Sequence, residues 1–351
     1  MALPNGLYWL SLKVFSLVVG DAVKACLFSL LILVSCQSLA NEVSSKPRFL
    51  VVPKTVTNPF FDDVEKGCLQ AAAELDVECV YIGSEEADAR YQDQIISQQI
   101  EQGLDGISVS VINSRVLTHR SMQLAKEKQI PVVTFDSDFS EKALAADPKL
   151  RHSYIGTDNF QFGFQLGRLT QALKPQGGSF CIITGHKGAA NLIERISGLY
   201  AGLGFNNTSG KSDLWEELSR CPIYSDDDAQ RSLNNLDRML RLHQYEPKLL
   251  DVIVTVGAWP QTLEFKYSDI VSPHLDSLSS QQLLLIFGDT LEVQKRLLAQ
   301  GLAHGNVGQS PYDMGYQSIY TLYSIHQGKT VEPLIHTKLE RCVFGQIPMC
   351  Q

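Results

Sequence analysis

Short apolar segments alternate with amphipathic segments along most of this chain, and only brief turns separate them. The first apolar run, FLVVPK, is nearly continuous, which is typical of a parallel strand covered on both faces. A helical pattern over residues 60–75 follows it, and further runs such as DGISVSV, FCIITG and LLLIFGD each precede another helical segment. This repeated strand–helix unit predicts doubly wound parallel α/β sheets.

The pattern restarts near Thr157, so we predict two Rossmann-like domains of comparable size. A chain of 351 residues with 44% hydrophobic content is long enough to build both cores. The last elements are too few for a domain of their own and must join the sheets already made, so the chain crosses between the domains more than once. The predicted first domain is residues 47–157 plus 310–336, and the second is residues 158–309 plus 337–351.

The N-terminus has the pattern of an export signal. Residues 25–35 (ACLFSLLILVS) are apolar and too short to span a bilayer, and Ser38-Leu39-Ala40 offers a small-x-small cleavage site. We therefore predict a signal peptide over residues 1–40, with translation starting near Val23, and a periplasmic protein. The alternative is a lipobox that would anchor the chain through Cys36.

Six of the eight cysteines lie beyond the predicted signal peptide. An even number in an exported chain predicts disulfides, although six cysteines allow about 15 pairings. Their positions favour short links between neighbouring elements, and the alternative is that several are buried free thiols. The expected pairs are Cys68 with Cys79, Cys181 with Cys221, and Cys342 with Cys350.

Charge and motifs exclude several classes of function. The formal net charge is −8 and the basic residues form no long block, so nucleic acid is not an expected partner. The sequence has no GxGxxG after its first strand, no GxxxxGK[ST] loop, no GxSxG and no HExxH. We therefore expect no enzyme activity, no metal and no cofactor.

Polar side chains recur where the predicted strands end. Asp136 closes VVTFD, Asp289 closes LLLIFGD, Gln309 closes GNVGQ, and Asn58 follows the first strand. Open α/β sheets bind ligands outside the carboxyl ends of their strands. Carboxylates and amides there would hydrogen-bond hydroxyl groups, although any single one could instead cap the following helix.

Aromatic side chains are predicted at the same edge. Phe60 and Phe61 follow the first strand directly, and Trp259 follows a later strand in VGAWPQ. A sugar ring has apolar faces and a polar rim, so flat aromatics together with polar groups suit a sugar. The alternative for Phe61 is packing beneath the first helix.

With these residues in view, the chain resembles the periplasmic sugar-binding proteins of the ribose-binding type, the partners of ABC importers. The resemblance covers about residues 48–338 and is carried by TNPFFDDVEKG, TFDSD, IGTDN, NLIERISG and GQSPYDMGYQ in this order. It implies two α/β domains joined by three crossovers, with the ligand in the cleft between them. The residues that it assigns to ligand binding are Asn58, Phe60, Phe61, Asp136, Asp289 and Gln309.

The chain also departs from the ribose-binding pattern. Ser137 and Ile193 stand where arginines are expected, and Ala258 stands where an asparagine is expected. Arg195 is present at a position interpreted as structural. Ribose itself is therefore in doubt, and further candidates for ligand binding are Lys54, Ser137, Asn191, Asp227 and Trp259. The two-cysteine tail, LERCVFGQIPMC, resembles one branch of the family and favours the pair formed by Cys342 and Cys350.

The resemblance implies a monomer that captures a monosaccharide or related polyol and delivers it to an ABC permease. The alternative partner is a chemoreceptor or a sensor kinase. A regulator of the lac-repressor type would need an N-terminal DNA-binding segment where this chain has a signal. A sugar hydrolase that uses Asp136 and Asp289 as a carboxylate pair is the enzymatic alternative.

Overall fold

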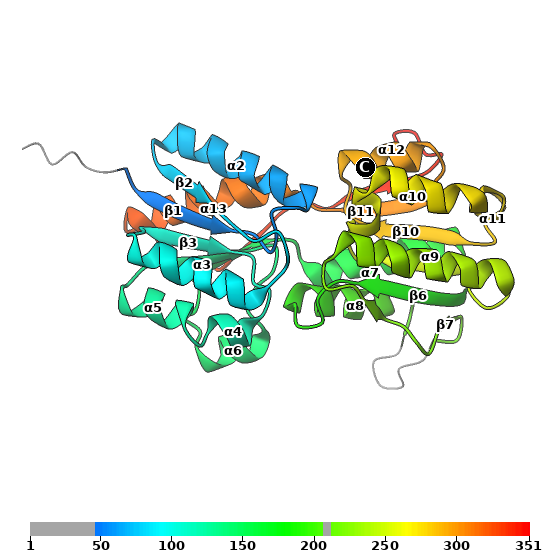
Figure 1. The fold of residues 1–351 in the computed structure, drawn as a ribbon, viewed down its shortest axis with the longest axis horizontal. Coiled ribbons are helices and arrows are strands. Elements are labelled where there is room, and N and C mark those ends of the chain that lie inside the picture. The colour runs from blue at the N-terminus through cyan, green and yellow to red at the C-terminus, as the bar shows by residue number, and fades with distance from the viewer. Residues whose placement is uncertain (1–45, 206–211) are drawn as a thin grey trace, which may run out of the picture. The chain divides into compact units, whose positions relative to one another are not determined.

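The computed structural model describes residues 46–205 and 212–351. The predicted signal peptide, with Val23, Cys36 and the cleavage site at Ala40, lies outside the described residues. Pro47–Gln351 forms one compact unit that contains two α/β domains (Figure 1). The prediction of two doubly wound domains is confirmed. No helix among the described residues is both long and apolar enough to cross a membrane.

The first domain is built on a six-stranded, all-parallel sheet. In spatial order its strands are β12 (Leu334–His336), β5 (Ser153–Gly156), β4 (Val132–Phe135), β3 (Gly106–Val109), β1 (Arg48–Val52) and β2 (Glu78–Tyr81). Its helices are α2 (Pro59–Leu75), α3 (Ala89–Glu101), α4 (Ser114–Leu117), α5 (Ser121–Glu127), α6 (Glu141–Ala146) and α13 (Pro311–His326).

Successive residues of β1 face opposite sides of this sheet, as the two-residue period of a strand requires. Phe49 and Val51 pack with α2 and α13, which lie side by side, whereas Leu50 and Val52 pack with α3 and α5 (Figure 1). All four side chains are fully buried. This two-sided burial explains why the strand is apolar at every position rather than at every second one.

The second domain is built on a seven-stranded sheet. Its strands are β13 (Glu340–Val343), β11 (Gly305–Gly308), β10 (Leu284–Gly288), β9 (Val252–Thr255), β6 (Gly178–Thr184) and β7 (Trp215–Glu217), with β8 (Ile223–Tyr224) also paired to β6. Its helices are α7 (Asn159–Leu173), α8 (Ala190–Gly202), α9 (Ala229–Tyr245), α10 (Glu264–Val271), α11 (Leu275–Ser279) and α12 (Glu292–Ala299), and its 3₁₀ turns are η2 (Trp259–Thr262) and η3 (Ser272–His274).

The chain passes between the two sheets three times among the described residues. It leaves the first sheet after β5, returns after β11 into α13, and leaves again between β12 and β13. Among the strands that the structure describes, only β13 pairs antiparallel, to β11, because the chain re-enters the second sheet at its edge and runs back along it. The two sheets therefore share three short connections.

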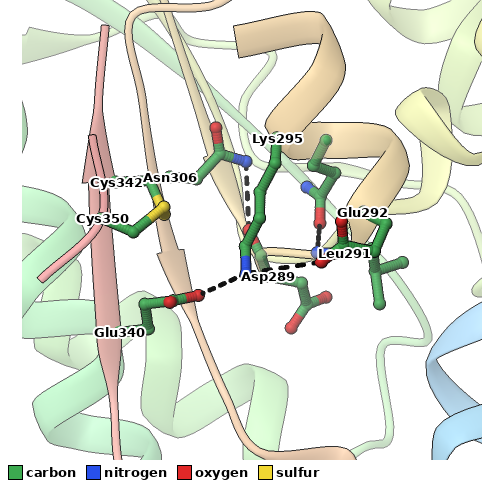
Figure 2. Close-up of a disulfide and its surroundings, with 9 residues drawn as sticks. Asp289, Leu291, Glu292, Lys295, Asn306, Glu340, Cys342 and Cys350 are labelled. Atoms are coloured by element: carbon green, nitrogen blue, oxygen red, sulfur yellow. Dashed lines mark hydrogen bonds and ion pairs between the residues drawn. A yellow bond between two sulfur atoms is a disulfide. The ribbon is translucent and has the colours of Figure 1, made fainter. Parts of the chain in front are cut away.

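The cysteines beyond the predicted signal peptide form three disulfides. Cys68 in α2 is bonded to Cys79 in β2, Cys181 in β6 to Cys221, and Cys342 in β13 to Cys350. Figure 2 shows the last of these beside Lys295, which contacts Glu292 and Glu340. The bond closes the C-terminal segment back onto β13.

Replacing both Cys342 and Cys350 by alanine is expected to lower the free energy of unfolding by about 2–3 kcal/mol. The bond closes a loop with a sequence separation of 8, and the chain-entropy model gives about this value for a loop of that size. Urea denaturation of the variant and the parent measures the difference. An unchanged denaturation midpoint would show that β13 is held by its pairing with β11 alone.

Candidate ligand-binding site

A small cavity of about 30 Å³ lies where side chains from both domains meet beyond the ends of their strands. Ten of the eleven residues predicted for the site line this cavity, together with Thr55, Leu192 and Arg195. Those ten are Lys54, Asn58, Phe60, Phe61, Asp136, Asn191, Asp227, Trp259, Asp289 and Gln309. Ser137 does not line the cavity, and its side chain is buried with no hydrogen-bond partner for Oγ among the described residues.

Asp136 and Asp289 occupy equivalent places in the two domains. Asp136 directly follows β4 and Asp289 directly follows β10. Both have left-handed backbone conformations, with φ of 56° and 70°, which few residues other than glycine adopt. With this backbone conformation, each carboxylate lies at the cavity and not along the helix that follows it in the chain. Residues held in such conformations are often functional.

Asp136 is the centre of a buried charge cluster. Its Oδ2 accepts a hydrogen bond from Ser110 Oγ at 2.7 Å and lies 3.5 Å from Lys54 Nζ. Its Oδ1 accepts from Asn191 Nδ2 at 3.4 Å and lies 3.8 Å from an Nη atom of Arg195. All five side chains are buried. Two buried cations thus lie within 4 Å of this carboxylate.

Asp289 is held by neutral partners. Gln309 Nε2 donates to its Oδ1 at 2.7 Å, and the backbone N–H of Ala258 donates to its Oδ2 at 3.0 Å. Arg195 in turn donates to Gln309 Oε1 at 2.8 Å. Burial raises the pKa of Asp289, because the ionised carboxylate loses its hydration, while Arg195 and Gln309 act in the opposite direction.

Arg195 links the two carboxylates, and its participation in the cavity was not expected from the sequence. Its Nε donates to Asn159 Oδ1 and an Nη atom donates to the carbonyl of Val256, both at 2.9 Å. Its guanidinium lies 4.2 Å from the ring centre of Phe162. These contacts support the structural interpretation, but the side chain also lines the cavity.

A helical spacing could have identified Arg195 in advance. Asn191 and Arg195 are four residues apart on α8 and therefore share a face. Both are buried, whereas Ile193, which stands at an expected arginine position, is 57% exposed. The positive charge that the ribose-binding pattern places at position 193 is thus absent. The arginine of α8 that lines the cavity is instead Arg195.

The aromatic side of the cavity comes from the start of α2 and from η2. Asn58 caps α2 by accepting a hydrogen bond from the Phe60 N–H at 3.0 Å, so it both caps the helix and lines the cavity. The rings of Phe60 and Phe61 are perpendicular, with centroids 5.1 Å apart. Phe61 also packs edge-on against Phe135 in the core. Trp259, which is 7% exposed, lies in η2 of the other domain.

Asp227 differs from the other two cavity carboxylates. Its Oδ1 accepts the backbone N–H of His186 at 3.3 Å, whereas its Oδ2 is buried and has no hydrogen-bond partner among the described residues. Burial raises the pKa of this carboxyl, because its charged form loses hydration that no partner replaces in full.

The fold and this cavity define a class of two-domain α/β proteins that bind a small molecule between their domains. The comparison with known families agrees, since residues 49–330 match the model of the periplasmic binding protein domain. The chain belongs to this family.

Two relatives of known name match part of the chain. Identity is 29% over 166 residues with the xylose/arabinose-binding protein of Sulfolobus acidocaldarius, covering 45% of this chain and 40% of that protein. Identity is 27% over 202 residues with the D-ribose/D-allose-binding protein of Pseudomonas aeruginosa, covering 54% of this chain and 63% of that protein. The alignments thus span less than two thirds of either relative.

A solved structure matches over a greater length. An ABC-transporter solute-binding protein from Burkholderia graminis, solved in complex with D-arabinose, is 28% identical. The match has a TM-score of 0.71 and covers 85% of this chain and 96% of that chain.

Proposed function

We propose that this protein captures a monosaccharide or related polyol between its two domains and delivers it to an ABC importer. Its family supports the proposal, as do the two relatives named for pentose or allose binding and the similar protein solved with D-arabinose. In this proposal the protein acts as a periplasmic monomer, and it binds its ligand without chemical change.

The observation that carries the proposal is the pairing of hydrogen-bonding groups with aromatic rings around one buried cavity. Asp136, Asp289 and Gln309 supply carboxylate and amide groups at the strand ends of both domains. Phe60 and Trp259 supply flat apolar surfaces from opposite domains. A sugar needs both kinds of surface, because its ring faces are apolar and its hydroxyl groups donate and accept hydrogen bonds.

Ligand binding would replace contacts that now join the domains directly. Lys54 Nζ of the first domain donates to Asn191 Oδ1 of the second at 3.1 Å, and Asn191 also reaches Asp136. A cavity of about 30 Å³ is far below the several hundred Å³ (about 300 or more) of ordinary ligand pockets. A sugar would therefore enter an opened cleft, and closure over it would produce the form that an importer recognises.

A thermal-shift screen of the refolded mature protein tests this function. The panel contains pentoses, hexoses, amino sugars, sugar alcohols and, as unrelated small molecules, amino acids. A sugar present at about a thousandfold excess over its Kd stabilises the folded protein by about 4 kcal/mol, so the melting temperature should rise clearly for one sugar or a small group. A flat response to every sugar from well-folded protein would refute the proposal, and release of product from a glycoside would indicate a hydrolase instead.

A further inference from the structure

The cavity carries more negative than positive charge. Three carboxylates line it, those of Asp136, Asp227 and Asp289, and the two cations in its lining are Lys54 and Arg195. Both cations make their close carboxylate contacts with Asp136. Asp289 is held by an amide and a backbone N–H, as described above. The remaining carboxylate, Asp227, thus has no cation at ion-pair distance among the described residues.

The backbone directs Asp227 into the interior. Asp226 and Asp227 both have left-handed conformations, with φ of 53° and 59°. The carboxylate of Asp227 lies against Gly185, where an added Cβ would come within 1.7 Å of Oδ1. The position of this side chain is therefore set in two ways. Two successive residues have a rare backbone conformation, and a glycine leaves room for one carboxylate oxygen.

The basic groups near Asp227 make their closest contacts elsewhere. Burial raises the pKa of Asp227, and Lys54 acts in the opposite direction because it favours the ionised form, but the carboxylate at ion-pair distance from Lys54 Nζ is that of Asp136. His186 Nδ1 accepts the backbone N–H of Gly188 at 3.0 Å, and the backbone of His186 rather than its ring donates to Asp227 Oδ1. Lys187 is exposed and lies 5.6 Å from the centre of the Tyr224 ring. A buried carboxylate oxygen without a donor costs free energy unless a ligand supplies one.

The outer part of the cleft is acidic too. A larger hollow of about 520 Å³ shares Thr55, Asn58, Asp227 and Trp259 with the cavity. Its lining carries the carboxylates of Glu85, Glu86, Asp88, Asp226, Asp227 and Asp228. The cations in this lining are Arg231, which pairs with Asp226, and Lys266, which donates to Gln230 at 2.6 Å. Such a surface attracts cations and repels anions.

We propose that the ligand is a sugar or polyol that carries a protonated amine, and that Asp227 Oδ2 receives its ammonium group. A hydroxyl group could also donate to Oδ2, but it would leave the excess negative charge unbalanced in the buried cavity. An ammonium group supplies the donor and the charge together. This inference rests on the proposed function and narrows it from monosaccharides in general to amino-substituted ones.

Matched sugars that differ only in the amine test the inference. Isothermal titration calorimetry at about pH 6, well below the pKa of ordinary amines, compares D-glucose, D-glucosamine and N-acetyl-D-glucosamine, and the corresponding galactose and mannose series. In at least one series the amino sugar is expected to bind about tenfold or more tightly than its neutral parent, because a buried charge pair contributes at least this much. N-acetylation, which removes the charge, should abolish the preference.

Asp227→Asn, compared with Asp269→Asn, shows whether Asp227 is the source of this preference. The first variant should reduce the ratio of amino-sugar to neutral-sugar affinity about tenfold or more. The second alters an exposed aspartate of α10 that lines neither the cavity nor the larger hollow and should leave the ratio unchanged. On the parent protein, raising the salt from about 0.02 M to about 0.5 M should weaken binding of the amino sugar but not of its neutral parent.

The possible outcomes separate this inference from the proposed function. If neutral sugars bind as tightly as their amino derivatives in every series, the inference is wrong and the proposed function stands. An amine preference that survives in Asp227→Asn also overturns it, because the ammonium would then bind elsewhere. If the screen above finds no sugar of any kind, the proposed function fails and the inference fails with it.

Discussion

Replacing Arg195 by alanine is expected to lower the free energy of unfolding by about 3–5 kcal/mol, the usual cost of removing one partner from a buried ion pair. The variant would leave Asn159 Oδ1, Gln309 Oε1 and the carbonyl of Val256 without their donor. It would also remove a cation near Asp136. Urea denaturation followed by circular dichroism measures the loss.

Two further variants separate charge from packing at this position. Arg195→Met keeps an apolar chain over Phe162 but no donor, so it should recover only a small part of the lost stability. Arg168→Ala removes an exposed arginine of α7 that donates to Gln171 at 2.7 Å, and it should change stability by less than about 0.5 kcal/mol. A stability of Arg195→Ala equal to that of Arg168→Ala would show that the buried network contributes nothing.

Replacing Asp136 by alanine is expected to weaken sugar binding about a thousandfold, which corresponds to about 4 kcal/mol. In the proposed function this carboxylate accepts hydrogen bonds from sugar hydroxyls, and its loss would also leave Lys54 and Arg195 without their nearby carboxylate. Truncating one member of a buried charge pair at a binding site costs about 2–5 kcal/mol. Isothermal titration calorimetry with the sugar found by the thermal-shift screen measures the effect.

The controls for Asp136 address both folding and charge. Asp136→Asn keeps the shape and the Ser110 contact, and it should retain more affinity than the alanine variant. Asp237→Ala removes a partly exposed aspartate of α9 that pairs with Arg241 and lines neither the cavity nor the larger hollow, and it should leave sugar affinity unchanged. If Asp136→Ala is folded and binds sugar like the parent, the carboxylate takes no part in recognition.

Strand periodicity made the position of most candidate site residues predictable. The first strand is apolar at four successive positions because it is buried on both faces, and the first polar group after it falls at the sheet edge. Asp136, Asp289 and Gln309 follow β4, β10 and β11 directly, so counting to the end of each apolar run located them. Their convergence on one cavity follows from the parallel direction of the strands.

Side-chain direction within loops and helices was not predictable in the same way. Ser137 follows Asp136 directly but is buried away from the cavity, because the left-handed residue before it reverses the chain. Asp158 lies two residues after the end of β5, yet it caps α7 by accepting the Gln161 N–H at 2.9 Å. A strand-end position alone does not distinguish a capping residue from one that lines the site.

The sequence by itself determined the two α/β domains, the strand ends at which polar and aromatic residues gather, and the family. The domains and the strand ends follow from local periodicity, which every apolar segment of a parallel sheet repeats, whereas the family follows from the resemblance of short motifs. Only the tertiary structure decided that Arg195 joins Asp136 and Gln309, and that Asp227 has a buried oxygen without a donor among the described residues. Both facts depend on residues that are far apart in the chain. Burial and the pairing of charges are set by which segments come together in the fold, and the order of residues within one segment does not determine them.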